Sequence, residues 1–125
     1  MRLLVFTLAL LLSFSSAFAH EMVPTYPKWR NSYIDDLLVT QMEMFNKRND
    51  VEYFEVAVFD ESWNPIPFVT SFRVFKLEYL SRVTFDVYIR QQDKDRARYI
   101  CSRSKTTDFK TGVTSMICSK FKEAK

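Results

Sequence analysis

Glycine and histidine are almost absent from this chain of 125 residues, which contains one of each, Gly112 and His20. A single glycine excludes the glycine-rich loops that hold nucleotides, and it leaves tight turns with positive φ to Asn, Asp or Ser. A single histidine means that a Ser-His-Asp or Cys-His site would need His20 as its base. A zinc site would need more ligands than the chain offers. We therefore predict that the protein is not an enzyme and holds no metal or cofactor.

Long apolar runs are also scarce, and the clearest one lies at the start of the chain. It extends from Leu3 to Leu12, follows Arg2, and is succeeded by Ala17-Phe18-Ala19. A basic residue, a short apolar run and an Ala-x-Ala exit are typical of a secretory signal peptide. The run is too short to span a membrane, which takes about 20 apolar residues. We predict that residues 1–19 are a signal peptide, that residues 20–125 form one domain, and that the protein is secreted and extracellular.

Cysteine is limited to Cys101 and Cys118. In an oxidising compartment such a pair most simply forms one disulfide, and free reactive thiols are the alternative. The ring that this disulfide closes would stabilise the fold by about 3 kcal/mol in the loop-entropy model.

Charge is distributed unevenly along the chain. Residues 20–95 contain 9 basic and 13 acidic side chains, a net charge of −4, whereas residues 96–125 contain 8 basic and 2 acidic, a net charge of +6. The basic segment is either the solvated face of two strands or an edge that meets an acidic protein, a glycan or a membrane surface. We expect no nucleic acid partner, because no groove-reading motif is present.

Apolar residues recur at helical spacing early in the predicted domain, at Ile34, Leu37, Leu38, Met42 and Phe45. Asn31 or Ser32 can cap the start of a helix, and Asn49-Asp50 can end it. Residues 20–30 contain two prolines and no periodic pattern, which indicates an extended arm. The sequence therefore predicts an arm followed by one amphipathic helix.

After Asp50 the apolar period changes to two, which predicts strands at residues 51–60, 68–80 and 83–90 and a final hairpin from 97–103 and 113–121. Pro65 and Pro67 separate the first two strands. The expected fold class is α+β, with one N-terminal α-helix packed across a four- to five-stranded antiparallel sheet. Unpaired sheet edges allow either a monomer or a strand-swapped dimer.

Three apolar segments have no obvious place in this core, namely residues 22–24, residues 63–69 and Phe109. They can form a line of contact with a protein partner if they lie on one side of the molecule. Alternatively, Trp63 and Phe68 fold back and close an open end of the core. The sequence leaves both possibilities open.

Several motifs resemble those of the cystatins, secreted inhibitors of papain-like cysteine proteases. Residues 44–50 resemble the helix end of that family, where a Tyr-Asn-Lys segment leads into the first long strand. Residues 80–84 are similar to its Leu-Gly-Arg-Thr-Thr segment. Cys101 and Cys118 lie where the family's C-terminal disulfide joins the last hairpin, whereas the family's other disulfide is missing here.

The resemblance implies that a protease cleft would be filled by an N-terminal arm and two loops. The arm corresponds to Val23 and Pro24, and the second loop to Asp108 and Phe109. The first loop corresponds to five residues, Pro67, Phe68, Val69, Thr70 and Ser71. The family has an arm glycine, a Gln-Val-Val-Ala-Gly loop and a Pro-Trp loop, so this chain departs from its pattern in all three places. These departures add bulk where the backbone must approach a narrow cleft closely.

Three functions are therefore expected from the sequence. The first is a secreted cystatin-like protein that acts by protein binding, with degenerate inhibitory loops. The second is an inhibitor of papain-like cysteine proteases with altered loops. The third is a basic secreted defence protein that binds anionic surfaces through residues 96–125.

Overall fold

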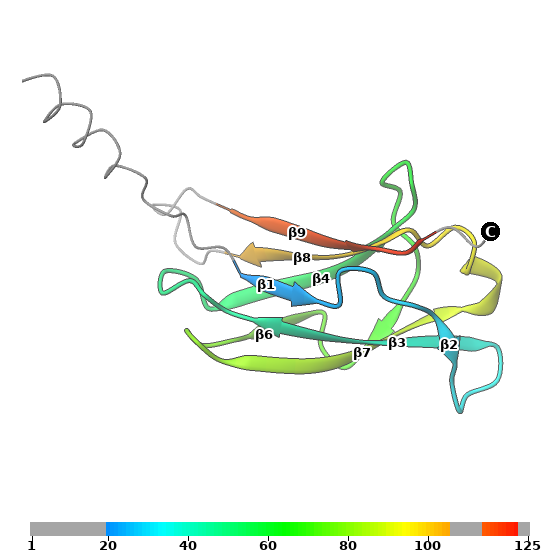
Figure 1. Ribbon diagram of the computed structural model, residues 1–125, viewed down its shortest axis with the longest axis horizontal. Coiled ribbons are helices and arrows are strands. Elements are labelled where there is room, and N and C mark those ends of the chain that lie inside the picture. The colour runs from blue at the N-terminus through cyan, green and yellow to red at the C-terminus, as the bar shows by residue number, and fades with distance from the viewer. Residues whose placement is uncertain (1–19, 106–113, 123–125) are drawn as a thin grey trace, which may run out of the picture.

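The computed structural model describes residues 20–105 and 114–122, and these residues form two antiparallel β-sheets packed face to face (Figure 1). The described part of the chain contains no α-helix, and its helical content is the short 3₁₀ turn η1 (Gln91–Asp93). The predicted α+β class, with a helix across one sheet, is therefore wrong.

The first sheet is built around two long strands, β3 (Leu37–Phe45) and β7 (Arg82–Arg90), which pair along their whole lengths. The short strand β5 (Val69–Thr70) lies on the far side of β7. The other side of β3 carries β1 (Glu21–Val23) and β2 (Arg30–Asn31), which pair with different parts of that strand.

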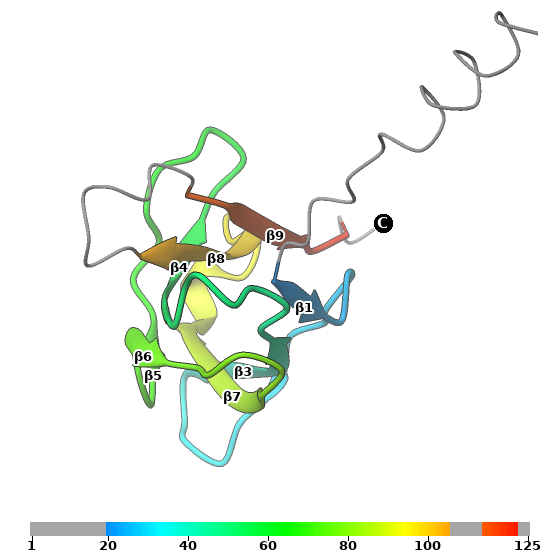
Figure 2. The same cartoon turned by 90° about the vertical axis from the view of Figure 1, so that its left-hand side faces the viewer.

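The second sheet has the strand order β6-β4-β8-β9. Its members are β6 (Val74–Lys76), β4 (Tyr53–Phe59), β8 (Tyr99–Lys105) and β9 (Met116–Lys120). Figure 2 shows β4, β8 and β9 in one layer and β3 and β7 in the other. Two sheets with orders β1-β3-β7-β5 and β6-β4-β8-β9 have the arrangement of an immunoglobulin-like β-sandwich.

The predicted helix is strand β3, because the inward side chains follow a period of two. Leu38, Met42 and Met44 are buried in the core, and Thr40 occupies the inward position between the first two. The predicted helix cap, Ser32, instead orders the turn between β2 and β3. Its Oγ accepts a hydrogen bond from the Ile34 amide at 3.1 Å, as in a local Ser turn.

Two further expectations need correction. The predicted arm contains β1, which is paired with β3 rather than projecting from the domain. The predicted strand at residues 68–80 is divided between the two sheets, since β5 pairs with β7 and β6 pairs with β4. The strands predicted at residues 51–60 and 83–90 and the final hairpin are confirmed as β4, β7 and β8–β9.

The core lies between the sheets and is closed by apolar side chains from most of the strands. The largest fully buried side chains are Phe54, Met42, Met44, Ile89 and Ile100. The predicted disulfide between Cys101 and Cys118 is confirmed, and it joins directly opposite residues of β8 and β9. Within residues 20–105 and 114–122, no helix is long and apolar enough to cross a membrane.

Candidate functional site

The predicted contact residues do not lie together. Val23 and the following Pro24 are at one edge of the first sheet, at the end of β1, whereas Val69 and Thr70 form β5 at the opposite edge. Strands β3 and β7 stand between them. Asp108 and Phe109 lie outside the described residues. The structure therefore does not bring the arm and the first predicted loop into one line of contact.

Residues 67–74 instead form a corner that leaves the second sheet, enters β5 and returns to β6. Three apolar side chains of this corner are strongly exposed: Val69 by 63%, Phe72 by 61% and Val74 by 51%. Arg73 is held beside them, with its guanidinium 4.6 Å from the centre of the Phe68 ring and a hydrogen bond to the Phe68 carbonyl. The corner therefore exposes three apolar side chains within six residues.

A groove of about 500 Å³ runs between this corner and strand β4. Residues 55–59 form its floor, residues 65–68 form one wall, and Arg73 and Val74 form the other. Each wall of the groove is attached to β4 by a backbone hydrogen bond. The Val56 amide donates to the Arg73 carbonyl at 2.8 Å, and the Val58 carbonyl accepts from the Ile66 amide at 2.9 Å.

The stretch of β4 between these two bonds has unused hydrogen-bonding groups. The amide and carbonyl of one strand residue point to the same side, so the Val56 carbonyl and the Val58 amide face the groove edge. Neither group has a hydrogen-bond partner within the described chain. Backbone groups in the interior are almost always paired, so an open pair beside a groove can bond to the backbone of another polypeptide.

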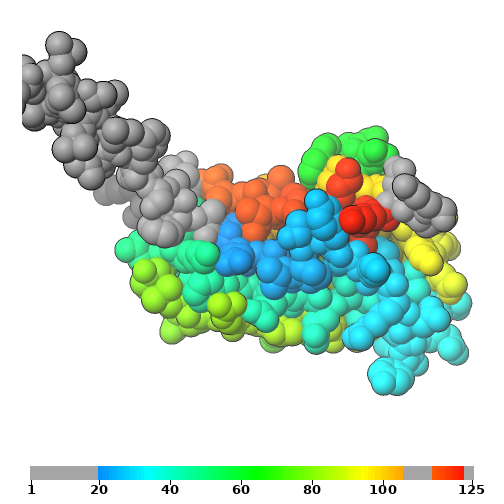
Figure 3. Space-filling model, in the orientation of Figure 1, coloured from blue at the N-terminus to red at the C-terminus, as the bar shows by residue number. Residues whose placement is uncertain are grey.

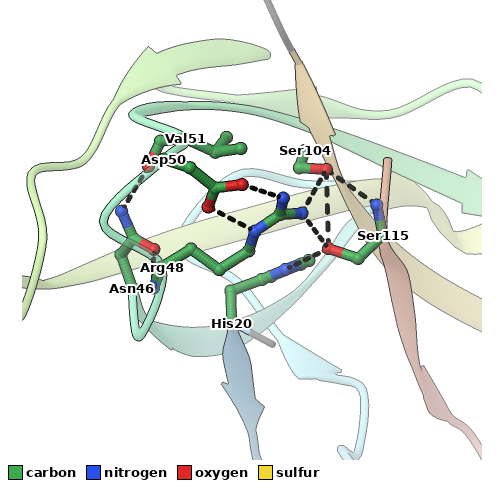
Figure 4. A network of polar contacts seen from close by, with 7 residues as sticks. All are labelled: His20, Asn46, Arg48, Asp50, Val51, Ser104 and Ser115. Atoms are coloured by element: carbon green, nitrogen blue, oxygen red, sulfur yellow. Dashed lines mark hydrogen bonds and ion pairs between the residues drawn. The ribbon is translucent and has the colours of Figure 1, made fainter. Parts of the chain in front are cut away.

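A separate site, made of polar side chains, lies at the end of the sandwich where β1 begins (Figure 4). The His20 side chain is 3% exposed, and its ring packs 4.8 Å from the ring of Phe54. Its Nε2 is 3.1 Å from the Ser102 carbonyl, which can only accept, so Nε2 carries the proton and donates. Nδ1 then accepts from the Ser115 hydroxyl at 3.2 Å. His20 thereby joins β1, β8 and the start of β9.

Arg48 extends this network from the β3–β4 connection. Its guanidinium donates twice to Asp50, at 2.9 and 2.6 Å, and once to the Ser115 hydroxyl at 3.3 Å. Burial lowers the pKa of His20 below its ordinary value of 6.5, the hydrogen bond to the Ser102 backbone raises it, and the positive charge of Arg48 lowers it. The hydrogen bond from Arg48 lowers the pKa of Asp50.

This cluster lacks the arrangement of a catalytic triad. The carboxylate of Asp50 contacts Arg48 and not the His20 ring, and the ring nitrogens are occupied by Ser102 and Ser115. Among the described residues, no group of three or more His, Cys, Asp or Glu side chains could hold a metal ion. The hydrogen bonds of the cluster link the chain before β1, the β3–β4 connection, β8 and the residue before β9 at one end of the sandwich.

The sequence alone does not indicate the important members of either site. Phe72, Arg73 and Val74 lie inside a stretch that is predicted as one continuous strand. The role of His20 depends on partners 82 and 95 positions away along the chain, which no local pattern reveals.

No family model and no curated protein sequence matches this chain. Two solved structures are similar to it. One is the Escherichia coli chaperone DraB, with a TM-score of 0.56 and 15% identity over 83% of this chain and 53% of that one. The other is a FixG-related protein from Vibrio parahaemolyticus, with a TM-score of 0.50 and 14% identity over 86% of this chain and 98% of that one.

These likenesses concern the β-sandwich fold, and the chain spans about half the length of the DraB chain. Neither structure is a cystatin. The predicted cystatin resemblance depended on a helix that leads into the first strand, and this premise is wrong because residues 37–45 are β3.

Proposed function

We propose that the protein is an exported binding domain that accepts a short extended segment of another polypeptide in the groove along β4. The observation that carries this proposal is the open pair of backbone groups on Val56 and Val58, placed beside exposed apolar side chains. In peptide recognition of this kind, main-chain hydrogen bonds supply affinity and side-chain pockets supply specificity.

The geometry defines which peptide groups would bond. A partner residue placed opposite Ala57 has neighbours that accept from the Val58 amide and donate to the Val56 carbonyl. Its side chains can then contact Val74 on the groove wall, whose exposed surface would be removed from water. The expected ligand is therefore an extended, apolar stretch, and the similarity in fold to a chaperone is compatible with such a ligand.

The proposal is tested with a library of short random peptides and with hydrogen exchange of the backbone amides. We expect apolar peptides to be selected and to slow exchange of the Val58 amide. The Val56 amide is an internal control, because it is already bonded to the Arg73 carbonyl.

A pair of matched variants completes the test. Val74→Ser should weaken peptide binding, whereas Tyr33→Ser, which changes a fully exposed aromatic residue between β2 and β3, should not. Absence of any bound peptide, or binding that leaves exchange of the Val58 amide unchanged and is equally strong in the Val74 variant, would refute the proposal.

A further inference from the structure

A larger cavity, of about 680 Å³, lies at the end of the sandwich away from His20. It is formed where residues 26–29, the segment after η1 at residues 94–98, and residues 121–122 after β9 come together. Figure 3 shows these segments in blue, yellow and red at one end of the molecule. The cavity shares no lining residue with the groove along β4, and its volume is typical of sites for small ligands.

One wall of this cavity is flat and apolar. Trp29 stacks on Phe121 with ring centres 4.3 Å apart and an angle of 11° between the rings. Phe121 is 5% exposed and belongs to the core, so this wall is fixed in place. The indole N–H of Trp29 is buried and has no hydrogen-bond partner within the described chain.

The rim of the cavity is strongly basic. Lys28, Lys94, Arg98 and Lys122 line it together with one acidic side chain, Asp95, so the charges sum to 4 − 1 = +3. Arg98 donates to the Phe121 carbonyl at 3.3 Å.

The three lysines of this rim lack the carboxylate partners that most other described basic side chains have. In the part of the chain that the structure describes, none of them takes part in an ion pair. By contrast, three other basic side chains of the described C-terminal segment have carboxylate partners, since Arg96 pairs with Asp93, and Arg103 and Lys105 both pair with Glu55. Unpaired like charges gathered around one hollow repel one another, and an anionic ligand would relieve this repulsion.

We propose that this cavity binds a small organic anion with a planar apolar body. The body lies against the Trp29 wall, and a carboxylate or sulfonate group faces the three lysines. This inference is independent of the peptide groove.

The two tryptophans allow the site to be observed directly. Trp29 lines the cavity. Trp63 lies in the connection after β4 and stacks on Tyr99 of β8, with ring centres 4.4 Å apart. Each gives one indole N–H signal in a ¹H–¹⁵N spectrum, and Trp63→Phe assigns the two. The protein is expressed from its full sequence, and the exported form is titrated with naphthalene-1-sulfonate at low salt. We expect the Trp29 signal to shift with saturation while the Trp63 signal stays in place.

Charge dependence separates this site from unspecific adsorption to apolar surface. The combined variant Lys28→Ser, Lys94→Ser and Lys122→Ser should weaken binding about tenfold, which corresponds to about 1.4 kcal/mol. Lys120→Ser, which removes a neighbouring lysine outside the cavity, should leave the affinity unchanged. The uncharged probe 1-naphthylmethanol should bind much more weakly, and high salt should reduce the affinity of the sulfonate.

A Trp29 signal that does not move, or an affinity that the triple variant leaves unchanged while its spectrum remains that of a folded protein, would overturn the inference. Equal shifts of both indole signals would also overturn it, because they indicate adsorption at many places.

Discussion

Acidification below pH 6.5 is expected to destabilise the protein through His20. The ring is buried, its Nε2 donates to the Ser102 carbonyl, and the guanidinium of Arg48 is close by. Burial lowers the pKa of His20 in the folded protein, whereas the unfolded chain keeps the ordinary value of 6.5. Between the two pKa values the unfolded chain binds a proton that the folded chain does not, so the free energy of unfolding falls as the pH falls through this window.

The size of the effect has an upper bound. If the folded ring stays neutral, protonation of the unfolded chain lowers the free energy of unfolding by about 1.4 kcal/mol at about pH 5.5 and by about 2.1 kcal/mol at about pH 5.0. The carboxylates act in a separate window. The pKa values of Asp50 and Asp93 are lowered in the folded protein, so their stabilising effect is present above the unfolded values and is lost only at lower pH.

The assay is urea unfolding of the protein between about pH 7.5 and pH 5.0, compared with the variant His20→Asn. The asparagine side chain does not titrate, and at a chain start it does not cyclise as glutamine does. The variant should lose some stability at neutral pH, and its free energy of unfolding should change less on acidification than that of the wild type. The same pH dependence in both proteins would refute the assigned role of His20, as would a wild type that becomes more stable below pH 6.5.

Four further outcomes are expected. The exported protein should begin at His20 by N-terminal sequencing, and any other start would contradict the predicted signal peptide. Replacement of Cys101 and Cys118 by alanine should lower the free energy of unfolding by about 3 kcal/mol in urea titrations, and an unchanged midpoint would show that the closed ring contributes little. Asp93→Asn should cost about 2 kcal/mol by thermal unfolding, because this buried carboxylate accepts hydrogen bonds from two half-exposed arginines, and a cost below about 0.5 kcal/mol would contradict that role. Titration against papain should give no inhibition at micromolar concentration, since the arm and the first predicted loop lie at opposite edges of the first sheet, and stoichiometric inhibition would support the protease hypothesis.

Strands with uninterrupted alternation could be predicted from the sequence. Residues 82–90 alternate apolar and polar side chains without a break, and the structure places Phe85, Val87 and Ile89 in the core. Strand β3 could not be predicted in the same way, because polar Thr40 takes an inward position. The apolar side chains of Leu37 and Phe45 on the outward face then completed a helical pattern by coincidence.

The candidate sites depended on information that a local pattern does not contain. Residues 68–80 alternate like one strand, yet their two halves pair with different sheets, and this division creates the groove. The basic cavity joins segments from three distant parts of the chain, so its charge was visible in the sequence only as an excess in the C-terminal segment. Contacts between residues far apart in the chain determine both the groove and the cavity.

The burial of His20 also has a consequence for the order of events during export. A peptidase that removes a leader after Ala19 requires the neighbouring residues in an accessible, extended form. In the folded domain the His20 ring is enclosed, and the next three residues are hydrogen-bonded to β3 as β1. If residues 1–19 are a leader, folding before cleavage would therefore enclose the residue that follows the cleavage point, and we expect cleavage to precede closure of the sandwich. A precursor that folds first is then expected to be cleaved only when β1 separates from β3.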